Sequence, residues 1–141
     1  MCEEEFEEDI VRAHLHRGEY ESAIEVAGTV ECDWQRADLF AEIARTLSKA
    51  GMAPLAEGTW KLAVAAAREG ELSESSQDSH DASSVLWEIS EDMATAGNWD
   101  DGERVASGIR SELKRRRAVD NLEAMKRGGR GAFASLRTPS R

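Results

Sequence analysis

ADLFAEIARTLSKAGMAPLAEGTWKLA, residues 37–63, is the stretch of this sequence that decides its fold. Its first half places small or apolar residues at the i, i+3, i+4, i+7 spacing of one helical face: Phe40, Ile43, Ala44 and Leu47. Gly51 can adopt the left-handed backbone that ends a helix, and Pro54 suits the first turn of the next one. The stretch therefore predicts two antiparallel helices joined by a tight turn.

This pattern of helix, glycine and second helix occurs three times along the chain. Each turn glycine is followed five positions later by a small residue, in the pairs Gly18 and Ala23, Gly51 and Ala56, and Gly97 and Gly102. Another stripe with helical spacing precedes Gly97: Leu86, Ile89, Ser90 and Met93. Such repetition is typical of stacked helix pairs. We expect three pairs, at about 3–31, 33–70 and 81–113.

The segments between and after these pairs are predicted from composition. The turn glycines are 33 and then 46 residues apart, and the polar run at 70–80 predicts a loop insertion at 71–80, with Asp81 capping the helix that follows. Ala118, Leu122 and Met125 predict a capping helix at 114–127 over the open end of the stack. Residues 1–127 would then form one α-helical repeat domain, and the glycine-rich residues 128–141 a disordered basic tail.

Charge is distributed unevenly along the 141 residues. Residues 110–141 carry ten Lys or Arg against three Asp or Glu, a net charge of +7, so the remaining 109 residues carry −17 of the total of −10. The basic segment includes Lys114, Arg115, Arg116, Arg117, Arg127 and Arg130. It could bind single-stranded nucleic acid, or the acidic N-terminal end of another copy in a head-to-tail oligomer.

Several classes of protein are not indicated by this sequence. No apolar run approaches the length of a transmembrane helix, and the acidic start differs from a secretory signal, so we expect a cytoplasmic protein with reduced Cys2 and Cys32. His14 and His16 are two residues apart, on different sides of a helix, and predict no metal site. Phosphate-binding loops and nucleophile motifs are missing, which predicts a non-enzymatic protein without a cofactor.

Gly18-Glu19-Tyr20-Glu21-Ser22-Ala23 resembles the Gly-x-Tyr-x-x-Ala turn of the tetratricopeptide repeat (TPR). Similar positions recur in the second unit, at Ala44, Gly51, Ala56, Trp60 and Ala63, and in the third, at Ser90, Gly97, Trp99, Gly102, Ala106 and Ile109. The resemblance covers about 100 residues. It implies an all-α fold in which three antiparallel pairs stack as a short right-handed superhelix; a plain bundle of six or seven helices would give a similar pattern.

The resemblance also implies a binding groove lined by the first helix of each pair. Arg12, His16, Arg45, Lys49, Trp87 and Glu91 would face it. A basic groove would suit an acidic partner peptide, and Trp87 would be the most exposed tryptophan. The alternative is that these are ordinary solvated positions on helices. The expected function is a scaffold or adaptor that binds a protein or peptide, with nucleic-acid binding or self-assembly as the alternatives.

Overall fold

The computed structural model describes the backbone of residues 5–137 and the side chains of residues 5–128. Over this range the chain forms seven α-helices and no strand, so the predicted all-α class is confirmed. The helices are α1 (Glu5–His16), α2 (Tyr20–Ala27), α3 (Asp33–Lys49), α4 (Ala53–Glu71), α5 (Ser76–Thr95), α6 (Trp99–Ser107) and α7 (Glu112–Arg137).

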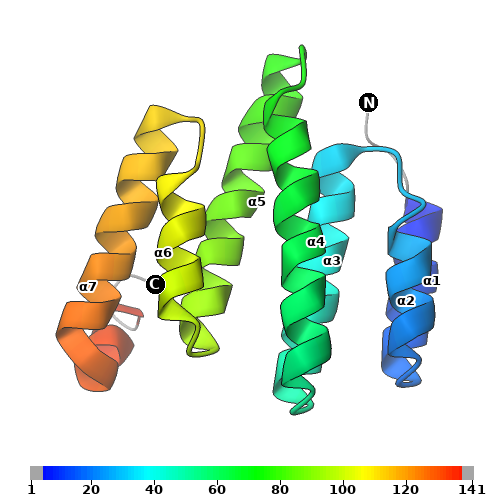
Figure 1. The fold of residues 1–141 in the computed structure, drawn as a ribbon, viewed down its shortest axis with the longest axis horizontal. Coiled ribbons are helices and arrows are strands. Elements are labelled where there is room, and N and C mark those ends of the chain that lie inside the picture. The colour runs from blue at the N-terminus through cyan, green and yellow to red at the C-terminus, as the bar shows by residue number, and fades with distance from the viewer. Residues whose placement is uncertain (1–4, 138–141) are drawn as a thin grey trace.

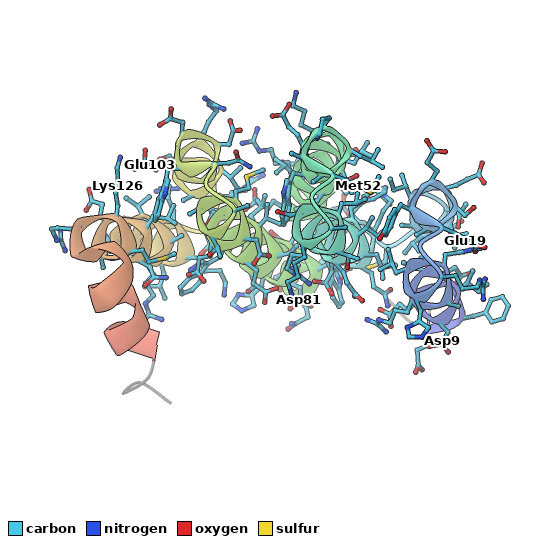
Figure 2. The ribbon with its side chains drawn as sticks, turned by 90° about the horizontal axis from the view of Figure 1, so that it is seen from below. Asp9, Glu19, Met52, Asp81, Glu103 and Lys126 are labelled. Atoms are coloured by element: carbon cyan, nitrogen blue, oxygen red, sulfur yellow. The ribbon has the colours of Figure 1, made fainter. Side chains whose placement is uncertain are left out.

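Consecutive helices alternate in direction and stack along one axis in chain order (Figure 1). Seen along the helices, they form two layers, with α1, α3, α5 and α7 in one and α2, α4 and α6 in the other (Figure 2). The first helices of successive pairs contact one another, and each second helix packs on the first helix of the next pair. The second helices have no comparable contact among themselves, so their layer is the more open of the two.

The turns within the three pairs have the same geometry. Gly18, Gly51 and Gly97 have φ values of 75°, 79° and 96°, and they are the positive-φ residues of the part of the chain that the structure describes. In the second turn the Met52 amide donates to the Leu47 carbonyl at 3.0 Å, and the Gly51 amide donates to the Ser48 carbonyl at 3.1 Å. This Schellman pattern recurs in the other two turns, which confirms the predicted helix-ending glycines.

The core is built from large side chains in one layer and small ones in the other. The predicted stripes of α3 and α5 are buried, and Ile43, Leu47, Leu86 and Ile89 are fully covered. The second helices contribute chiefly small residues, among them Ala23, Ala56, Ala63 and Gly102. A Cβ added at Gly102 would lie 2.7 Å from the Ser90 carbonyl oxygen, so α6 approaches α5 more closely than any side chain would allow.

The predicted loop at 71–80 is mostly helix. α4 continues to Glu71, residues 72–75 form the connection, and α5 begins at Ser76. Ser75, not Asp81, is the N-cap residue: its side chain accepts a hydrogen bond from the Asp78 amide at 3.2 Å. A serine-rich run favours caps and turns, but the single cap uses Ser75 and leaves Ser76 and Ser79 inside the helix. The extra residues lengthen α4 and α5, which extend beyond their neighbours (Figure 1).

α7 is longer than the predicted capping helix at 114–127. Its inner stripe is buried as expected, with Ala118 fully covered and Leu122 and Met125 nearly so. Its backbone stays helical to Arg137, within the predicted disordered tail, because helix-favouring residues follow the glycines and no proline occurs before Pro139. The end of α7 turns away from the stack (Figure 2). Residues 138–141 lie outside the described residues.

Glu71 joins three segments at the end of α4. The side chain is buried, and its Oε2 accepts hydrogen bonds from the Ser83 hydroxyl at 2.7 Å and from the Arg110 amide at 2.8 Å. These donors lie on α5 and on the turn before α7, so one carboxylate replaces the water that both donors lose on burial. No pattern in the sequence indicated this contact.

Two expectations concern the environment of the protein. Among residues 5–137, no helix combines the length and the apolar character that crossing a bilayer requires. Cys32 is part of a disulfide, whereas the sequence predicted a reduced thiol; Cys2 lies outside the described residues. The cytoplasmic location stays a prediction.

Candidate binding surfaces

Arg12 lies on the face formed by the first helices, where the resemblance predicted a groove. Its guanidinium donates to both carboxylate oxygens of Glu42, at 3.1 and 3.2 Å, and lies 3.7 Å from Glu8. These hydrogen bonds from a charged donor raise the pKa of Arg12 above its ordinary value. The residue therefore links α1 to α3 and is already paired.

Arg45 forms the corresponding link between α3 and α5. Its guanidinium donates to Asp92 Oδ2 at 2.7 Å, and both side chains are partly buried. His16 and Lys49, the other predicted basic groove residues, are exposed at the ends of α1 and α3. Lys49 forms no ion pair with the described part of the chain, whereas Arg45 is paired with Asp92. Of these two predicted groove cations, Lys49 is therefore the more available to a ligand.

Trp87 and Glu91 are connected on the same face. The Trp87 indole Nε1 donates to Glu91 Oε2 at 2.7 Å, and the Asn121 amide of α7 donates to the same oxygen. Trp87 is half-buried and packs against the core, as Trp34 and Trp99 do, and that it is the most exposed tryptophan stays a prediction. Four of the six predicted groove residues thus form contacts within the stack; a role for them in partner binding stays a prediction.

Acidic side chains lie close to both arginines on the first-helix face, and a basic groove there stays a prediction. Glu8, Asp38, Glu42, Glu88 and Asp92 surround the two arginines. Burial is the main cause that raises the pKa of Asp38, and the carboxylates of Glu42 and Glu8 raise it further against the opposing effect of Arg45. Partial burial, followed by the charge of Asp38, raises the pKa of Glu88. Carboxylates from α3 and α5 therefore disfavour each other's ionised form.

A cleft of about 420 Å³ lies on the opposite layer, between α4 and α6. One face of α4 forms its longer wall, with Glu57, Trp60, Lys61, Val64, Ala65 and Arg68 at helical spacing. Asn98, Asp101, Arg104 and Val105 form the facing wall, and Met93 of α5 lies between them. The cleft exists because α4 and α6 both pack on α5 without closing on each other.

The interior of this cleft is apolar, with one polar group. Trp60, Met93 and Val105 are nearly fully buried, and Val64 is half-buried. The Trp60 indole Nε1 is buried and has no hydrogen-bond acceptor within the described residues. A buried donor without an acceptor costs free energy. The sequence placed Trp60 at a repeat-like position but did not indicate that it borders a cavity.

The rim of the cleft carries charges of both signs. Arg104 is used locally, since it donates to Asp101 at 2.6 Å. Lys61 and Arg68 lie on the same face of α4, about two helical turns apart. Neither forms an ion pair with any described carboxylate. Two unpaired cations therefore border an apolar interior, an arrangement typical of sites that orient an amphipathic ligand.

The predicted basic segment is divided between internal and exposed roles. Arg115 donates to the Ile109 carbonyl at 2.9 Å and so stabilises the turn after α6, and Arg116 lies 3.8 Å from Glu112. Arg117 and Arg127 are exposed, whereas Lys114 is half-buried. Arg130 lies beyond the side chains that the structure describes. The run of cations is thus less available to nucleic acid than its sequence suggests.

The histidines and acids provide no metal centre in the part of the chain that the structure describes. His14 instead approaches Glu19, with 2.7 Å between Nδ1 and Oε1, beside the Gly18 turn. This hydrogen bond, together with one from Arg17, lowers the pKa of Glu19.

Models of known protein families give no match to this chain, and comparisons with curated proteins and with solved structures give none either. We therefore infer a function from the surfaces described above.

Proposed function

We propose that this chain is a short TPR-like helical-repeat protein, not an enzyme, and that it binds a segment of a partner protein in the α4–α6 cleft. The cleft is the main support for this proposal: it has a volume of about 420 Å³, an apolar interior and, at Trp60, a buried indole donor that lacks an acceptor among the described residues. Three pairs with equivalent turns support the repeat architecture, and a right-handed superhelix would follow from the resemblance.

The cleft suggests the chemistry of the bound segment. Apolar side chains would contact Trp60, Val64 and Val105, and burying them would supply most of the affinity. A carbonyl oxygen would accept from the Trp60 indole, and an acidic side chain would pair with Lys61 or Arg68. α4 lines the cleft over about three helical turns, a length that accommodates an amphipathic helix or a short extended peptide.

Selection from a displayed library of random peptides tests the proposal. We expect enriched sequences that combine large apolar residues with Asp or Glu. Val64→Arg should weaken binding of an enriched peptide at least about tenfold, because it places a charge in the apolar interior. Leu62→Arg is the matched control, since Leu62 is on the same helix, 45% exposed and outside the cleft. Equal loss in both variants, or no enrichment, would contradict the proposal.

Two tryptophans report separately on the two candidate surfaces. Titration with the enriched peptide should shift the Trp60 indole resonance in a ¹⁵N–¹H spectrum, because that N–H gains an acceptor. The Trp87 indole already donates to Glu91 on the other layer and should not move. If Trp87 shifts instead, and Arg45→Glu/Lys49→Glu abolishes binding, the partner occupies the first-helix face and the cleft is excluded.

A further inference from the structure

The two ends of the stack differ in charge, and each exposes a large apolar side chain. On α1, Phe6 is 73% exposed. The exposed acid Glu5 precedes it, and the exposed acid Asp9 lies three positions after it. On α7, Leu113 is 56% exposed beside the exposed Arg116 and Arg117. Leu72 and Leu62 are also exposed, but Phe6 and Leu113 lie at the two ends of the stack. Phe6 lies among acids, whereas the exposed charges near Leu113 are Glu112, Arg116 and Arg117, in which cations outnumber the single acid.

Among the helices that the structure describes, α1 and α7 each have a side without a neighbour. α1 packs on α2 and α3, and α7 packs on α5 and α6, so both are covered by the stack from one direction only. α1 and α7 are both first-layer helices that run in the same direction, and both begin at the same edge of the stack (Figure 1). A second copy placed along the stacking axis would therefore bring its Phe6 end level with the Leu113 end of the first copy.

We propose that copies of this chain associate head to tail, with the start of α1 in one copy packed on the start of α7 in the next. Phe6 would contact Leu113, and Glu5 and Asp9 would face Arg116 and Arg117. We infer that the partner of each end is a second copy of this chain, because the two complementary surfaces are the two ends of the same chain. A heterologous contact of this kind extends to short filaments unless the rotation between copies closes a ring. The proposal uses neither the cleft nor its partner and is independent of the proposed function.

Sedimentation velocity across protein concentration and salt tests the association. Near 10 mM salt, where the Debye length is about 30 Å, the sedimentation coefficient should rise with protein concentration. Near 1 M salt, where the Debye length is about 3 Å, it should approach the value of the monomer. A monomer at every concentration in low salt would overturn the proposal, as would association that strengthens with salt.

Two single substitutions test the polarity of the contact. Phe6→Ser removes the apolar anchor of the head and Leu113→Ser that of the tail; each should weaken self-association at least about tenfold. An equal mixture of the two variants should form a 1:1 dimer and nothing larger, because only one intact head and one intact tail can meet. Leu72→Ser, at a position 68% exposed and away from both ends, should associate like the wild type. A mixture that stays monomeric contradicts the proposal.

Discussion

The two layers of this protein are built from the same repeat but differ in how they are held together. The first helices contribute the large buried aliphatic side chains and are cross-linked between units by Arg12–Glu42 and Arg45–Asp92. The second helices contribute mainly small residues, pack closely on the first layer and remain apart from one another. Both layers therefore join successive pairs, but only the second leaves room for a ligand between its own helices. The layers should respond to opposite kinds of substitution.

Removing volume from the first layer should have the largest effect. Leu86 is fully buried, and Leu86→Ala should lower the free energy of unfolding by about 2–5 kcal/mol, because it leaves a cavity as well as losing apolar burial. Urea denaturation followed by circular dichroism measures the change. Leu62→Ala on α4 is the control, at 45% exposure, and should stay within about 0.5 kcal/mol of the wild type. Similar losses in both would mean that the layers do not differ in this way.

Adding volume to the second layer should have the next largest effect. Gly102→Ala should destabilise the protein by about 1–3 kcal/mol, because the new Cβ would meet the Ser90 backbone carbonyl at 2.7 Å. The same substitution at Gly58 meets no atom within 4 Å and should stabilise the protein by up to about 1 kcal/mol through helix propensity. Thermal denaturation of the two variants compares them directly. Stabilisation by Gly102→Ala would show that α6 can move away from α5.

Neutralising a surplus acid on the first-helix face should have the smallest effect, and its sign depends on pH. The pKa of Asp38 is raised by burial and by nearby carboxylates, so its ionised form destabilises the folded state. Asp38→Asn should therefore be more stable than the wild type at neutral pH, by up to about 0.5 kcal/mol. As the pH falls through the folded-state pKa of Asp38, its carboxylate is protonated and the advantage shrinks. Below the unfolded-state pKa of about 3.9 the carboxyl is protonated in both states, and the advantage should be lost.

Urea titrations at pH 7 and at pH 3 measure this difference. Glu42→Gln is the control of opposite sign, because it removes the charge that pairs with Arg12 and should cost up to about 1 kcal/mol at pH 7. An advantage of Asp38→Asn that persists at pH 3 would show that it has a cause other than the carboxylate charge.

Local interactions explain why the helices and turns were predictable. The hydrogen bonds that end each first helix join residues three and five positions apart, and the buried stripes follow from helical spacing. The error at 71–80 has a local cause as well, since serine serves equally as cap, turn or helix residue and composition does not choose among them. Asp81 was a plausible cap, but Ser75 precedes it and caps the helix first.

By itself, the sequence determined the helices, the three glycine turns and the small residue that follows each turn, because these depend on neighbours within one or two helical turns. Only the tertiary structure decided the sites. Arg12 and Arg45 are paired with acids 30 and 47 residues away, and the cleft arises from the spacing of α4 and α6 on α5. Such contacts depend on which helix faces meet, and helical periodicity does not encode that choice. The same spacing that places an arginine on a surface gives no indication of the carboxylate opposite it.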